Sequence, residues 1–140
     1  MSEDDPRVTL EDLTSEECWE LLAQRSIGRL AVVINNSPDI FPVNFKAWHQ
    51  EIYVQTAPGL KLAAAVLNPQ VAFEVDSIDE ADHSGWSVVV RGEATELENL
   101  DDLLFAQDLA VGPWAAGVKS RFLQIVPTAI AGRRLPTRTQ

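Results

Sequence analysis

The chain has 140 residues, of which 46% are hydrophobic and 23% charged, as expected for one folded domain with an ordinary core. Its net charge of −10, from 21 acidic and 11 basic residues, argues against binding to nucleic acids or anionic membrane surfaces. The single cysteine, Cys18, excludes an internal disulfide and a cysteine-rich zinc site. No apolar run approaches the ~20 residues of a membrane span and no signal-peptide pattern is present, so we expect a cytoplasmic protein.

The chain contains no internal repeat and no linker, so we expect a single domain over residues 14–135. The first 13 residues are polar and are expected to be disordered, and residues 136–140 form a short tail. Thr14 and Glu17 have the spacing of a capping box, which predicts a helix ending near Gln24. The apolar face of this helix consists of Cys18, Leu21 and Leu22. We therefore interpret the cysteine as an inert core residue.

Six later segments have the alternation or β-branched composition of strands. They are Arg29–Asn35, Ile40–Ala47, Glu51–Thr56, Val71–Asp76, Trp86–Leu97 and Arg121–Ile130. The first three follow one another through short turns, which predicts a meander, and Pro42 marks the second strand as lying at an edge or bulge. Two further helices are predicted, Leu60–Leu67 and Glu98–Val111. The fold class is therefore mainly β, a small six-stranded antiparallel Greek-key barrel with peripheral helices.

The segment from Gln55 to Leu62 has features of an anion site. It runs from a strand through a Pro-Gly turn into a predicted helix N-terminus, where backbone N–H groups favour negative charge. Gly59 allows close approach, and Thr56 adds a hydroxyl donor. Lys61 is unfavourable in the first turn of a helix unless an anion lies beside it. The alternative is a helix cap with a surface lysine.

A second candidate is the acidic loop between the fourth and fifth strands. Its side chains are those of Asp76, Asp79, Glu80, Asp82 and His83, and such oxygen-rich clusters suit hard cations. The spacing does not match a calcium loop. We favour a solvated hairpin loop without a metal.

Five segments taken together resemble a known family. They are Pro42-Val43-Asn44-Phe45, residues 56–62, Val71–Asp76, Gly85–Gly92 and Gly132-Arg133-Arg134-Leu135. In this order they are similar to the pyridoxamine 5'-phosphate oxidase-like family of FMN-binding split barrels, over about residues 12–135. The resemblance implies a six-stranded antiparallel split barrel, a homodimer and two FMN sites at the dimer interface.

The resemblance also implies which residues bind the cofactor. They are Val43 and Asn44 at the flavin ring, Gln55, Thr56, Gly59, Lys61 and Leu62 along the ribityl chain and phosphate, and Trp86 with Arg134 of the second subunit completing the pocket. Relatives commonly have arginine at the position of Gln55. An amide holds a phosphate less firmly than a guanidinium does, which implies loosely bound FMN.

The function implied by the resemblance is that of an FMN-dependent oxidoreductase, which exchanges hydride or electrons with an unidentified small molecule. The cofactor carries this chemistry, so no catalytic side chain is assigned. One alternative is a reductase that uses a deazaflavin coenzyme. Another is a cofactor-poor binding or regulatory dimer on the same fold, which Gln55 would permit.

Overall fold

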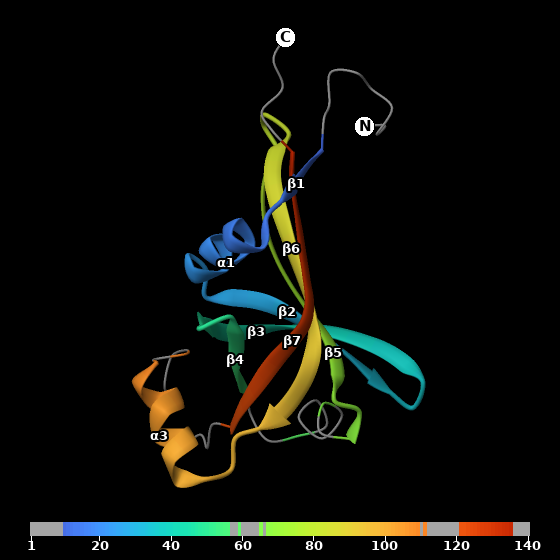
Figure 1. The fold of residues 1–140 in the computed structure, drawn as a ribbon. Coiled ribbons are helices and arrows are strands. Elements are labelled where there is room, and N and C mark those ends of the chain that lie inside the picture. Colours follow the sequence, from blue (N-terminus) through green and yellow to red (C-terminus); the bar gives the residue numbers. More distant parts are fainter. Residues whose placement is uncertain are drawn as a thin grey trace.

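The computed structural model of the protein describes residues 10–56, 59, 65, 67–109, 111 and 121–135. In chain order the elements are β1 (Glu11–Leu13), α1 (Ser15–Ala23), β2 (Ile27–Ile34), β3 (Ser37–Trp48), β4 (Glu51–Thr56), β5 (Gln70–Asp79), β6 (Ser84–Glu96), α3 (Leu100–Asp108) and β7 (Arg121–Leu135). The long strands β6 and β7 run side by side along the molecule, with α1 beside their upper half and α3 near the lower end of β7 (Figure 1). Within the described ranges, neither helix has the length and apolar character needed to cross a membrane.

The strands form one antiparallel sheet that closes into a ring. Its order is β1-β7-β4-β3-β2-β5-β6, and β6 also pairs with β7, so the six strands β2 to β7 complete the barrel. Strands β2, β3 and β4 form the predicted meander, and β5 returns beside β2, which is the Greek-key arrangement. The predicted fold class, a six-stranded antiparallel split barrel, is confirmed.

Local turn chemistry sets the register of the meander. Asn35 and Asn36 join β2 to β3 with φ angles of 49° and 65°. His49 and Gln50 join β3 to β4 with φ angles of 47° and 60°. Two consecutive residues with positive φ match the right-handed twist of the flanking strands, and asparagine tolerates this conformation better than most residues.

The barrel encloses one apolar core. Phe45 and Phe73 meet edge to face at its centre, with ring centroids 4.8 Å apart. Helix α1 begins with the predicted capping box and packs Cys18 and Leu22 into the same core. A second cluster lies beneath α3 and contains Tyr53, Leu97, Ala106, Val111 and Phe122. The helix therefore covers part of the outer face of the barrel.

The predicted boundary of the disordered N-terminus is wrong at its last three residues. Residues 1–9 lie outside the described part of the chain, but Glu11–Leu13 form β1 and pair with β7. The reason is that β7 continues to Leu135, beyond the predicted end at Ile130, and so offers an edge to β1. Glu11 and Asp12 lie opposite Arg134 and Arg133, so the pairing also brings together unlike charges.

The predicted helices Glu98–Val111 and Leu60–Leu67 differ in how much of each the structure describes. The predicted helix Glu98–Val111 is present as the shorter α3, which Asn99 caps by accepting a hydrogen bond from the Asp102 N–H. Most of the predicted helix Leu60–Leu67 lies outside the described residues. Ala65, which is described, is fully buried in the barrel core.

Candidate functional site

Two carboxamides lie side by side on the outer face of the barrel. Asn44 of β3 and Gln55 of β4 are register partners, and both are half-buried. Their neighbours Phe45 and Val54 are buried in the barrel, so strand alternation directs Asn44 and Gln55 outward. Ile27 of β2 pairs with Asn44 from the other side and is 60% exposed. These three residues form what we call the amide strip, two hydrogen-bonding groups beside an exposed apolar side chain.

The strip ends where β3 extends beyond β4. Pairing between the two strands starts at Asn44, so among the described strands residues 37–43 of β3 pair with β2 alone. Among the described strands Pro42 therefore lies at an edge, as predicted. Val43 is 8% exposed and faces the core, so only its backbone could reach a ligand at this edge. Thr56, the last residue of β4, is half-buried and pairs with Arg121.

The predicted phosphate end of the site is described only in part. Gly59 is exposed and has a φ of 155°, and a Cβ added to it would lie within 4 Å of no atom among the described residues. The backbone there is open to close approach, which is one of the requirements of an anion site. Lys61 and Leu62 lie outside the described residues.

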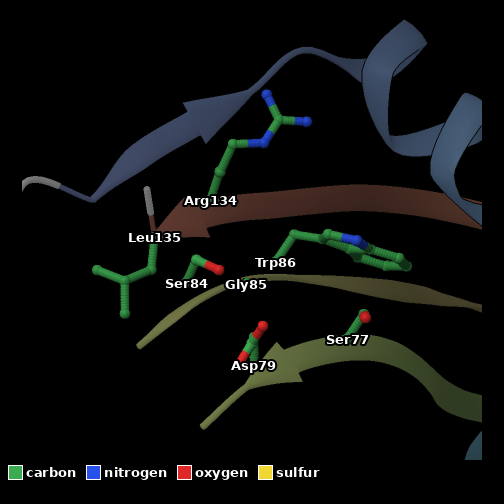
Figure 2. Close-up of a pocket in the computed structure, with 7 residues that line it drawn as sticks. All are labelled: Ser77, Asp79, Ser84, Gly85, Trp86, Arg134 and Leu135. Carbon is green, nitrogen blue, oxygen red and sulfur yellow. The ribbon is translucent and has the colours of Figure 1, made fainter. Parts of the chain in front are cut away.

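Trp86 and Arg134 lie together in a different part of the sheet. They are register partners on β6 and β7, and Ser77 of β5 is the other partner of Trp86 (Figure 2). The guanidinium carbon of Arg25 lies 5.6 Å from the centroid of the indole ring. The Arg134 guanidinium lies 3.8 Å from the carboxylate of Glu17 on α1.

Strand alternation shows that Trp86 and Arg134 lie on the face of the sheet opposite to the amide strip. Trp86 has the same parity along β6 as Val88 and Val90, which are both buried in the core. Asn44 and Gln55 have the outward parity. One protomer therefore does not unite the two groups, and a common site would need two copies of the chain.

The carboxylates of the predicted acidic loop are used to close its turn. Asp79 Oδ1 accepts from the Ala81 N–H at 2.9 Å. Asp82 Oδ1 accepts from the backbone N–H and the hydroxyl of Ser84 at 2.9 and 2.5 Å. Within the described ranges, no three His, Cys, Asp or Glu side chains are grouped so that they could hold a metal ion.

Cys18 is buried in the core with 1% exposure, as predicted. Burial raises the pKa of its thiol above the ordinary value, and the neighbouring carboxylate of Glu17 adds to this effect. Because the thiolate is the reactive form, the environment suppresses nucleophilic chemistry at this residue.

A charged cluster on the outer face was not predicted from the sequence. The Arg29 guanidinium on β2 lies 3.3 Å from Glu74 and 3.7 Å from Asp76, both on β5. Burial, and then a hydrogen bond and charge repulsion from Asp76, raise the pKa of Glu74 to about 7, while Arg29 opposes the rise. The spacing of two acids on one strand face was a visible signal, but the arginine becomes their partner only through the β2–β5 register.

One family model and several individual proteins are similar to this chain. Residues 14–134 match the family model described as pyridoxamine 5'-phosphate oxidase. The FAD-binding protein from Mycobacterium smegmatis is 38% identical, with a TM-score of 0.75, over 89% of this chain and 98% of that one. A FAD-binding protein from Mesorhizobium loti is 25% identical, with a TM-score of 0.77, over 89% of this chain and 97% of that one. An uncharacterized protein of Mycobacterium tuberculosis is 30% identical over 89% of this chain and 84% of its own length.

Proposed function

This chain belongs to the pyridoxamine 5'-phosphate oxidase family, and on that premise we propose that it is a flavin-binding oxidoreductase acting on a small molecule. The observation that carries the proposal is the similarity to the FAD-binding protein from Mycobacterium smegmatis, at 38% identity over nearly all of that protein. The flavin mononucleotide portion is common to FMN and FAD, so the same site could hold either cofactor. A bound flavin would supply hydride or electron transfer.

The amide strip has the chemistry that a flavin ring requires. The pyrimidine edge of the ring alternates carbonyl acceptors with an N–H donor, and carboxamides such as those of Asn44 and Gln55 can both donate and accept. The ring system itself is apolar and flat, and the exposed side chain of Ile27 lies next to Asn44 to contact it. In this arrangement the chain would orient the ring and exclude water from one of its faces.

The phosphate of FMN would lie beyond the end of β4. Thr56 would offer its hydroxyl, Gly59 would allow the backbone to approach, and Lys61 would supply the positive charge. Gln55 contributes an amide in place of the arginine common among relatives, so we propose that the phosphate is held weakly. A deazaflavin coenzyme with a longer anionic tail would need more basic groups along this edge.

A homodimer is part of the proposal. Trp86 and Arg134 lie on the sheet face opposite to the amide strip, so they can complete a flavin site only from the partner subunit. An isologous dimer would create two such sites related by symmetry. Light scattering coupled to size-exclusion chromatography should give twice the mass of the chain, and a monomer at micromolar concentrations would exclude a shared site.

The residue at position 55 also supports a second candidate, a cofactor-poor binding dimer. In that case the protein would keep the barrel but would bind flavin too weakly to retain it during purification.

The absorption spectrum of freshly purified protein tests the proposed function. We expect the visible bands of an oxidised flavin, which disappear on reduction, and release of FMN or FAD on denaturation, identified by mass spectrometry. If the purified protein is colourless, it should be titrated with FMN, FAD and a deazaflavin coenzyme. Absence of binding to all three would contradict the oxidoreductase proposal and favour the cofactor-poor dimer.

A further inference from the structure

A groove lies outside the amide strip, where β5 and β7 end and β6 begins. Its volume is about 350 Å³, and its walls include Ser77 and Asp79 from β5, Ser84 and Trp86 from β6, and Arg134 from β7. Figure 2 shows these side chains on three adjacent strands, with Asp79 opposite Ser84 and Ser77 opposite Trp86. We call this cavity the tip groove.

The tip groove combines an aromatic plane with groups that recognise a sugar. Arg25 lies over one face of the Trp86 ring, so a ligand base would stack on the other face. Asp79 uses one carboxylate oxygen to accept from the Ala81 N–H, and carboxylates are well suited to accept hydrogen bonds from the hydroxyls of a ribose. Ser77 and Ser84 add hydroxyl groups to the same walls.

Arg134 provides positive charge at the edge of this groove. Its guanidinium is 3.8 Å from Glu17, which is longer than a hydrogen bond, and its side chain is 40% exposed. Guanidinium groups bind phosphate oxygens through paired N–H donors. The tip groove therefore holds an aromatic plane, a carboxylate, hydroxyls and one cation, a set that matches base, ribose and phosphate.

We propose that the tip groove binds the adenosine-phosphate end of a dinucleotide. Two sources contain this chemistry: FAD, whose flavin end would lie on the amide strip of the partner subunit, and a nicotinamide dinucleotide that serves as reductant. The FAD case rests on the proposed function. Binding of adenosine diphosphate itself does not, because the tip groove is built from one protomer.

Calorimetric titration of the flavin-free protein with adenosine diphosphate, FMN and FAD tests this proposal. We expect adenosine diphosphate to bind alone, and FAD to bind at least about tenfold more tightly than FMN because it adds a stacked base. Asp79→Asn should weaken adenosine diphosphate and FAD about tenfold with FMN unchanged, and Trp86→Leu should weaken adenosine diphosphate about tenfold. Trp86→Phe should restore most of the affinity because it keeps an aromatic plane.

Matched controls are available on the same chain. Asp39 is an exposed aspartate whose Oδ1 accepts from the following backbone N–H, and Trp48 is an exposed tryptophan outside the groove. Asp39→Asn and Trp48→Leu should therefore change neither the affinity for adenosine diphosphate nor the affinity for FAD. Since Trp86 is half-buried and its leucine variant could lose stability, circular dichroism should accompany the titrations. The exposed Asp79→Asn substitution carries the test if Trp86→Leu does not fold.

The outcomes of these titrations distinguish FAD from a nicotinamide dinucleotide as the ligand, and they distinguish failure of the tip-groove proposal from failure of the proposed function. Competition between NADH and adenosine diphosphate, with equal affinities for FAD and FMN, would assign the groove to the nicotinamide dinucleotide. Absence of flavin binding, with adenosine diphosphate still bound and weakened by Asp79→Asn, would overturn only the proposed function. If adenosine diphosphate does not bind, or if Asp79→Asn leaves its affinity unchanged, the assignment of the tip groove is overturned. Equal loss of FMN and FAD affinity in Asp79→Asn would also overturn it, since the groove would then hold the part that the two flavins share.

Discussion

The guanidinium of Arg29 lies 3.3 Å from the carboxylate of Glu74, its register partner across the β2–β5 pair. Asp76, two residues along the same strand, lies 3.7 Å from the same guanidinium. One arginine thus faces two carboxylates on a half-exposed sheet surface. Burial is the main reason why the pKa of Glu74 is raised to about 7 although a cation is adjacent, and the hydrogen bond and charge of Asp76 add to the rise.

This cluster predicts a pH-dependent stability. The pKa of Glu74 is raised in the folded protein from the ordinary value of 4.5 to about 7, so the folded state holds the proton more tightly than the unfolded chain. The free energy of unfolding should therefore fall as pH rises from about 4.5 to about 7, and should then level off. Glu74→Gln imitates the protonated carboxyl and should remove this fall.

Urea unfolding at about pH 5 and about pH 8 measures the effect. The Glu74→Gln variant should be more stable than the wild type at the higher pH and nearly equal to it at the lower. Glu93→Gln, an exposed site on β6, serves as the control for the loss of one negative charge. An equal effect of both substitutions would mean that net charge, and not the cluster, governs the response.

Close packing between α1 and β7 predicts a specific rescue. A Cβ added at Gly132 would lie 2.6 Å from Cys18 Sγ and 3.0 Å from Leu13 Cδ1. Gly132→Ala should therefore destabilise the protein by about 1–3 kcal/mol, the usual cost of overpacking. Adding Cys18→Ala should recover much of this loss because it removes the nearest atom.

Gly92→Ala is the matched control for this rescue. Its Cβ would lie 2.4 Å from the backbone oxygen of Val126, so Cys18→Ala should not improve it. Denaturant unfolding of the single and double variants gives the coupling energy directly. Additive effects of Gly132→Ala and Cys18→Ala would contradict the contact.

The buried thiol predicts slow chemical modification. Cys18 is 1% exposed, and its pKa is raised by burial, so few thiolates form and reagents have little access. Iodoacetamide should label the folded protein far more slowly than the urea-unfolded protein, measured by mass spectrometry. Comparable rates in the two states would show that α1 opens readily from the barrel.

Gln55 predicts a gain of cofactor affinity by substitution. Gln55→Arg places a forked cation next to Thr56, which should tighten FMN binding by about 1.5–3 kcal/mol, the scale of a hydrogen bond to a charged group. Gln50→Arg adds the same charge at the exposed β3–β4 turn and should have little effect. Titration calorimetry compares the three proteins.

The wild-type affinity decides what the Gln55→Arg result means. A gain from weak wild-type binding would favour a deazaflavin coenzyme or a cofactor-poor dimer for the natural protein. Tight wild-type binding without a gain would indicate that Lys61 and the neighbouring backbone already hold the phosphate.

Features built by local interactions could be predicted from the sequence. The capping box of Thr14 and Glu17 starts α1, and period-2 alternation places β4 at Glu51–Thr56 as predicted. These features depend on residues a few positions apart, so the chain carries their signal directly. The Greek-key order followed from the number and length of such segments together with the family resemblance.

Tertiary structure alone decided which residues meet across the sheet. Alternation tells which face of its strand a residue occupies, but not which strand lies beside it. The pairing of Trp86 with Arg134, the Arg29–Glu74 contact and the extension of β7 to receive β1 all depend on registers between segments far apart in the chain. The predicted cofactor residues lie on two faces of the sheet for the same reason. Alternation assigns each residue to one side of its own strand, and only the closed barrel makes that side the inner or the outer face.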